Sequence, residues 1–188
     1  MKSTIQGKPV QHPDWGSTLW WRNILPDWCN CYPLQTVRAP SAIQVDVFKP
    51  SDLYGIDMLA VHRLNKNTGD TISVAGFEVY SDDNLVLVVR DGQGNDTRVS
   101  LKSGLFSSDT WNTLRLDFEL DGSVIPFVNG KNAYVNPSEP LKVPVDVEHD
   151  AGFVDGHAGL QSANQSQNDG YKDGQFLLND NFMVFEYQ

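Results

Sequence analysis

The sequence has no long apolar run and little that would direct it to a membrane. No stretch approaches the roughly 20 apolar residues that a membrane-spanning helix needs, so we expect no membrane insertion. The first residues, MKSTIQGKPVQHPDWG, lack the apolar core of a secretory signal. A cytoplasmic protein, a processed product, or a piece of a larger chain or assembly are the expectations that remain.

Basic residues and cysteines are scarce as well. The 14 Lys and Arg are outnumbered by 24 Asp and Glu, which gives a net charge of −10. Nucleic acids and anionic membrane surfaces are bound by clustered Lys and Arg, so we expect neither as a partner. Cys29 and Cys31 have no further Cys or His pair at the spacing of a zinc site. A disulfide across one residue would be strained, so two free thiols are expected.

Amphipathic helical patterns of three turns or more are absent, whereas alternation with a period of two is common. Residues 43, 45 and 47 are apolar and share one face of the segment 42–48, and residues 114, 116, 118 and 120 do the same in 111–120, which predicts half-buried strands. The segment 85–89 is apolar on both faces and is expected in the middle of a sheet. An Asp-Gly pair at 121–122 predicts a hairpin turn after the second of these strands.

About a dozen short strands with frequent turn signals predict one all-β domain, a two-sheet antiparallel sandwich over residues 1–188. No repeat of fixed period appears, which argues against propellers and solenoids. Residues 1–40 are less regular and hold every Trp except Trp111. We expect this segment to form an irregular N-terminal arm packed on the sandwich.

Three segments in the C-terminal part are similar, in order and spacing, to laminin-G-like and other domains of the concanavalin A-like superfamily. They are WNTLRLDFELDGSVIPFVNGK (111–131), GHAGLQS (156–162) and NDNFMVFE (179–186). The resemblance implies a concanavalin A-like jelly-roll sandwich, a fold that hosts lectins, glycan-cleaving enzymes and interaction domains. The polar loop 162–174 is longer than is usual in these families, and we interpret it as an elaboration at one rim.

The catalytic motifs that this resemblance implies are incomplete. Glucanases of the superfamily carry Glu-x-Asp-x-Glu on one strand, so that the carboxylates share a face. Here Glu-Leu-Asp at 119–121 gives only the first half before Gly-Ser follows. The alginate-lyase-type motifs are missing except for a loose likeness at Tyr171. The His residues share no metal-ligand spacing. We therefore predict no catalytic residue, and a polysaccharide lyase or glycoside hydrolase is kept as an alternative.

A structural Ca²⁺ is the metal that the resemblance implies. Many domains of the superfamily hold Ca²⁺ through an Asp of the closing strand together with residues near the N-terminus. Asp180 matches that position, and Asp14 or Asp46 is its expected partner. Carboxylate oxygens of this kind are the ligands that Ca²⁺ prefers.

The leading hypothesis is a non-catalytic carbohydrate-binding, lectin-like or adhesion module at an extracellular or cell-surface location. Sugars stack their apolar faces on aromatic rings, and their hydroxyls pair with polar side chains. A structural or protein-interaction domain of a virion or cell-surface assembly is a further alternative. The candidate ligand-binding residues, mostly loop aromatics, are Trp20, Trp21, Trp28, Tyr32, Arg115 and Tyr171.

Overall fold

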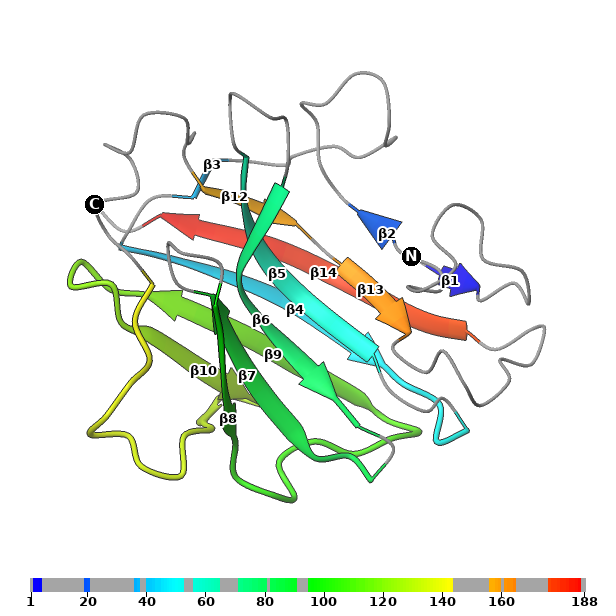
Figure 1. Cartoon of the computed structure of the whole chain (residues 1–188). Helices are drawn as coiled ribbons and strands as arrows, with labels where there is room; N and C mark the ends of the chain where they lie inside the picture. The colour runs from blue at the N-terminus through cyan, green and yellow to red at the C-terminus, as the bar shows by residue number, and fades with distance from the viewer. Residues whose placement is uncertain are drawn as a thin grey trace.

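The computed structural model describes residues 2–4, 19–20, 36–37, 40–52, 56–64, 71–80, 82–90, 95–143, 156–159, 161–164 and 176–186. These residues form two antiparallel β-sheets joined by one hydrophobic core, with no helix among them (Figure 1). The all-β, two-sheet architecture predicted from the sequence is confirmed.

One sheet has six strands in the order β1-β14-β4-β9-β10-β11. The last strand of the chain, β14, pairs with β4, so the closing segment lies beside an early one. In sheet order the strands are β1 (Lys2–Thr4), β14 (Phe176–Glu186), β4 (Ser41–Phe48), β9 (Trp111–Phe118), β10 (Val124–Val128) and β11 (Lys131–Asn132).

The other sheet has eight strands. Its main path is β2-β13-β5-β6-β7-β8, while β12 pairs with both β5 and β3. The strands are β2 (Leu19–Trp20), β3 (Thr36–Val37), β5 (Ile56–Leu64), β6 (Thr71–Val79), β7 (Leu85–Arg90), β8 (Asp96–Ser100), β12 (Gly156–Gly159) and β13 (Gln161–Asn164).

The core lies between the two sheets and follows from the alternation of each strand. On β4, Ile43, Val45 and Val47 are fully buried, while the residues after each of them are only partly buried. Phe77 of β6 and Leu87 of β7 join the same cluster from the opposite sheet. Burial of such side chains contributes roughly 1.5–3 kcal/mol each relative to exposure. The core therefore fixes which face of each strand points outward.

Two local predictions are confirmed by the topology. β7, which is apolar on both faces, lies between β6 and β8 and not at an edge. β9 and β10 form the predicted hairpin, with Gly122 in the left-handed region at φ 84°. The next turn, from β10 to β11, has Asn129 at φ 50° and Gly130 at φ 75°. Two successive positive φ angles are the pattern of a type I′ hairpin turn.

Most of residues 1–40, including both cysteines, lie outside the described residues, so the N-terminal arm and the single-domain organisation stay predictions. Within that segment, β2 pairs with β13 and β3 pairs with β12, which adds two short N-terminal pieces to the eight-stranded sheet. Among the described residues, no helix is long and apolar enough to cross a membrane.

Candidate functional site

The outer face of the eight-stranded sheet carries a buried carboxylate. Ala75, Phe77 and Val79 of β6 belong to the core cluster, so Glu78 between them points outward. Glu78 is nevertheless only 7% exposed. A buried charge is costly unless it is paired, so the partners of Glu78 determine what this part of the face can do.

Arg98 of β8 reaches across β7 to hold Glu78. Its Nη2 donates to Oε1 at 3.1 Å and its Nε donates to Oε2 at 3.3 Å. Such a two-point contact fits the planar guanidinium to the carboxylate. The cross-strand neighbours of Arg98 are Val88 and, beyond it, Gly76. Because both are small, they leave the long Arg98 side chain room to lie over the sheet.

Two further groups complete this arrangement, which we call the Arg98 cluster: Glu78, Tyr80, Asp96 and Arg98. The hydroxyl of Tyr80 donates to Oε2 of Glu78 at 3.0 Å. Nη2 of Arg98 also lies 3.3 Å from Oδ2 of Asp96. The cluster therefore joins residues of β6 and β8 and the residue just after β6 around one carboxylate.

The electrostatics of the Arg98 cluster fix its donors in place. The hydrogen bond to Glu78, with the charges of Glu78 and Asp96, raises the pKa of Arg98 above its ordinary value, although burial acts in the opposite direction. The Arg98 side chain is 48% exposed, against 9% for that of Glu78. A charged donor thus faces solvent while a buried acceptor holds its orientation.

The same geometry limits the chemistry of the cluster. With two carboxylates around one guanidinium, it carries an excess of negative charge. Both oxygens of Glu78 already accept hydrogen bonds, from Nε and Nη2 of Arg98 and from the hydroxyl of Tyr80. The buried carboxylate therefore orients two donor groups at the edge of the solvent.

The incomplete carboxylate motif lies elsewhere, in the turn that follows β9. Glu119 and Asp121 are both exposed there. Asp121 receives a hydrogen bond from Lys142 at 2.6 Å, which lowers its pKa below the ordinary value. Asp121 also accepts from the backbone of Ser123. These are the contacts of a hairpin turn, as the Asp-Gly sequence indicated.

Three residues singled out in the sequence lie on the outer face of the six-stranded sheet. Asp46 of β4 and Asp180 of β14 are opposite each other in the strand pairing. Arg115 of β9 donates to Asp117 at 2.5 and 3.1 Å. The guanidinium carbon of Arg115 also lies 5.1 Å from the centre of the Phe185 ring. This contact is a cation–π interaction.

The described residues around Asp46 do not by themselves fit Ca²⁺. Thr113 Oγ1 and Asn181 Nδ2 donate to the two oxygens of Asp46, at 2.6 and 2.7 Å. Ca²⁺ needs six to eight oxygen ligands, and no group of three or more His, Cys, Asp or Glu in the described part of the chain is placed to hold a metal ion. Asp14 lies outside that part, so the Ca²⁺ site stays a prediction.

The remaining candidates are the aromatic residues that the sequence analysis predicted to bind a ligand. Trp20 belongs to β2, at the edge of the eight-stranded sheet. Trp21, Trp28, Tyr32 and Tyr171 lie outside the described residues.

The Arg98 cluster was missed by sequence reasoning. The pattern Glu-x-Tyr at 78–80 does signal two polar groups on one face of a strand, because side chains alternate. Nothing local relates that strand to Arg98, since the contact depends on how three strands are paired.

Comparisons with known proteins agree on the fold. No protein-family model and no curated protein matches the sequence. An alginate lyase from Pseudomonas aeruginosa superposes with a TM-score of 0.58 at 12% identity over 78% of this chain and 64% of that one. A Bacillus licheniformis beta-glucanase superposes with a TM-score of 0.57 at 10% identity, over 82% of this chain and 69% of the glucanase chain. Xenopus laevis galectin-Ib superposes with a TM-score of 0.50 at 11% identity, over 89% of this chain and 99% of the galectin chain.

The chain therefore has the concanavalin A-like jelly-roll fold that the three C-terminal segments implied. It spans 60% to 64% of the length of the four alginate lyase chains that it resembles. At these identities the likeness is one of fold. Lyases, a glucanase and a galectin share this fold, so its relatives in structure include both carbohydrate-processing and carbohydrate-binding proteins.

Proposed function

We propose that this protein is a non-catalytic, lectin-like module that binds a neutral oligosaccharide or polysaccharide on the outer face of its eight-stranded sheet. The observation that carries the proposal is the Arg98 cluster. There a half-exposed guanidinium and a half-exposed tyrosine are both held by one buried carboxylate.

Sugar recognition needs polar groups whose direction is fixed before the ligand arrives, because ordering flexible side chains during binding weakens affinity. Arg98 meets this need, since Glu78 and Asp96 anchor its guanidinium. Tyr80 is 37% exposed, and a ring tethered by its hydroxyl can pack against the apolar face of a sugar.

Charge supports a neutral ligand over a uronate. The Arg98 cluster has more carboxylates than guanidinium groups, and the whole chain carries a net charge of −10. An acidic polysaccharide would be repelled both by the carboxylates of the Arg98 cluster and by the net negative charge of the chain, because like charges in a binding surface disfavour association. The lyase alternative is weakened for the same reason, since a lyase has to neutralise its uronate substrate.

Affinity electrophoresis tests the proposal directly. The wild-type protein would be run in gels containing soluble β-glucan, galactan or alginate, with Arg98→Ala, Tyr80→Ala and a control variant, Lys142→Ala. Lys142 is an exposed cation in the loop after β11, where it pairs with Asp121, so its replacement removes one positive charge as Arg98→Ala does. We expect retardation by at least one neutral polymer, reduced in the first two variants and kept in the control. No retardation of the wild-type protein by any of the three polymers would sink the proposal.

A further inference from the structure

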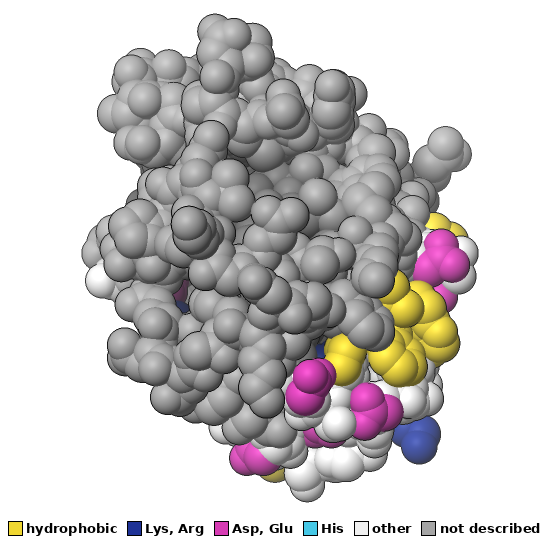
Figure 2. Space-filling view, turned by 90° about the vertical axis from the view of Figure 1, so that its right-hand side faces the viewer, with side chains coloured by type: hydrophobic (Ala, Val, Ile, Leu, Met, Phe, Trp, Pro, Cys, Tyr) yellow, Lys and Arg dark blue, Asp and Glu magenta, His cyan; other side chains and the backbone are white. Residues whose placement is uncertain are grey.

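The outer face of the six-stranded sheet carries an aromatic pair, in which Trp111 is exposed and Phe48 is partly buried. Trp111 of β9 is 48% exposed. Its ring lies 5.9 Å from the Phe48 ring of β4, at an interplanar angle of 60°. Leu178 of β14 is opposite Phe48 in the strand pairing. These three residues, two aromatic and one aliphatic, form a row across three strands that we call the aromatic row. Figure 2 shows hydrophobic side chains gathered at the surface, with acidic side chains beside them.

A polar row lies next to the aromatic row, two residues further along each strand. It consists of Thr113, Asp46 and Asp180, which are neighbours in the strand pairing. The spacing of two residues places it about 7 Å away on the same face. Asn181, at φ 49° in the bulge of β14, bonds Asp46 and so adds its amide to this row. Aromatic carbon and oriented polar groups thus stand side by side.

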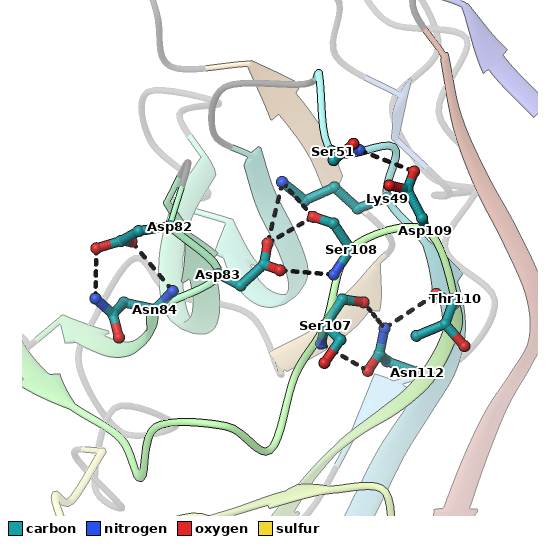
Figure 3. A network of polar contacts seen from close by, with 10 residues as sticks. All are labelled: Lys49, Ser51, Asp82, Asp83, Asn84, Ser107, Ser108, Asp109, Thr110 and Asn112. Carbon is teal, nitrogen blue, oxygen red and sulfur yellow. Dashed lines mark hydrogen bonds and ion pairs between the residues drawn. The ribbon is translucent and has the colours of Figure 1, made fainter.

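The aromatic row is held rigidly from one end of the sandwich. Lys49, next to Phe48, is fully buried, and its Nζ donates to Ser108 Oγ at 2.8 Å and to Asp83 Oδ1 at 3.3 Å (Figure 3). The backbone carbonyl of Lys49 accepts from Asp109 N at 2.8 Å. The loop that leads into Trp111 is therefore fastened to the residue that follows Phe48.

Asn112 fastens the same loop from the other side of Trp111. It is 2% exposed. Its Nδ2 donates to the carbonyls of Ser107 and Thr110 at 2.8 and 3.1 Å, and its Oδ1 accepts from Ser107 N at 3.2 Å (Figure 3). Such buried polar networks are a poor way to gain stability, since apolar packing is often better. They do fix one geometry, and a fixed aromatic surface binds with a smaller loss of entropy.

We propose that the aromatic and polar rows form a second binding site for a neutral glycan, on the side of the sandwich opposite the Arg98 cluster. Trp111 and Phe48 would contact the apolar face of a sugar ring, and Asp46 and Asp180 would accept hydrogen bonds from its hydroxyls. The carboxylates exclude a uronate by repulsion. This inference rests on the proposed function. With sites on opposite faces, one copy of the protein bridges two glycan chains, which strengthens binding to a polymer by avidity.

Turbidity together with affinity electrophoresis tests the bridging. The probe is whichever of β-glucan or galactan retards the wild-type protein. Four proteins would be compared: wild type, Trp111→Ala, the double variant Arg98→Ala/Tyr80→Ala, and Leu120→Ala, which removes another exposed apolar side chain, at 72% exposure. Thermal melting confirms that each is folded, and Trp111→Phe keeps an aromatic ring at the site.

We expect the wild type and Leu120→Ala to make the polymer solution turbid. Trp111→Ala and the double variant should each still be retarded, about tenfold more weakly than the wild type, but without turbidity. Trp111→Phe should keep part of the turbidity. Unchanged turbidity for Trp111→Ala, with no retardation of the double variant, would overturn the second site and leave the proposed function standing. A wild-type dimer in sedimentation that Trp111→Ala abolishes would also overturn it, because the face would then bind a second copy.

Discussion

Lys49 and Asp83 form an ion pair whose cation is fully buried while its anion is 28% exposed, with Nζ and Oδ1 3.3 Å apart. We predict that Lys49→Met lowers the free energy of unfolding by about 1–3 kcal/mol, the usual cost of leaving a polar group without its partner. Asp83 can regain water, so the loss stays below the roughly 3–5 kcal/mol of a fully buried broken pair. Urea denaturation measures the change.

Lys142→Met is the matched control for that prediction. Its pair with Asp121 is short, at 2.6 Å, but both side chains are more than half exposed. Exposed pairs contribute little to stability, so this variant should unfold at nearly the wild-type urea concentration. Equal destabilisation in the two lysine variants would show that burial of Lys49 is not what matters.

Asp83 should make stability depend on pH in the acid range. Burial raises its pKa, but hydrogen bonds from Ser108 and the charge of Lys49 outweigh that effect and hold the pKa below its ordinary value of 3.8. A lowered folded-state pKa contributes stability above the unfolded pKa, and this contribution is lost as pH falls through the folded pKa. In Asp83→Asn the difference from wild type should therefore be largest near pH 6 and shrink below pH ~4. A constant difference across urea titrations at these pH values would contradict this assignment.

Tyr134 should stabilise the loop after β11 by bonding it to β10. Its hydroxyl, in a side chain that is 2% exposed, donates to the Val124 carbonyl at 2.8 Å and accepts from Leu141 N at 2.9 Å. Burial raises its pKa above 10.0. We predict that Tyr134→Phe lowers the free energy of unfolding by about 1–3 kcal/mol, because two backbone groups lose a partner. The backbone amide of Leu141 should exchange its hydrogen faster in the variant. An unchanged exchange rate there would contradict a stabilising role for the Tyr134 hydroxyl.

Asn181 combines a backbone role with a side-chain role, and two substitutions separate them. Its φ of 49° is strained for most residues, and its amide bonds Asp46 at 2.7 Å. Asn181→Gly relieves the backbone and loses only the hydrogen bond, whereas Asn181→Ala incurs both costs. We expect the alanine variant to be less stable than the glycine variant by about 1 kcal/mol. Thermal melts that rank glycine below alanine would contradict the left-handed conformation.

The sequence predicted those parts of the fold that depend on local chemistry. The alternation in 111–120 predicted β9, and the Asp-Gly pair predicted the hairpin turn in which Gly122 has a positive φ angle. The C-terminal segments predicted the jelly roll as a whole. The strand and the turn could be predicted because each depends on residues a few positions apart, whereas the jelly roll was predicted from the order and spacing of three segments.

The candidate sites depend on pairings that the sequence does not display. Glu78 and Arg98 meet across an intervening strand, and Phe48 meets Trp111 from a strand 63 positions away. Arg115 was expected to bind a ligand, and in the structure its guanidinium forms an ion pair with Asp117 of the same strand. Asp14 or Asp46 was expected to join Asp180 in a Ca²⁺ site, which stays a prediction, and the strand pairing places Asp46 opposite Asp180. The strand register, set by the core, determines the contacts between strands, which is why the sequence alone does not show them.

Calorimetric titration of a neutral glycan into Trp111→Ala and into the double variant Trp111→Ala/Arg98→Ala tests the central claim most directly, because the Arg98 cluster is then the one proposed site that differs between the two proteins. The ligand would be a β-glucan or galactan oligosaccharide, with an alginate oligosaccharide as the anionic comparison. The account predicts measurable affinity of Trp111→Ala for a neutral ligand, a loss of about tenfold or more in the double variant, and no heat of binding with alginate. Equal affinity in the two proteins, or preferential binding of alginate, would contradict it.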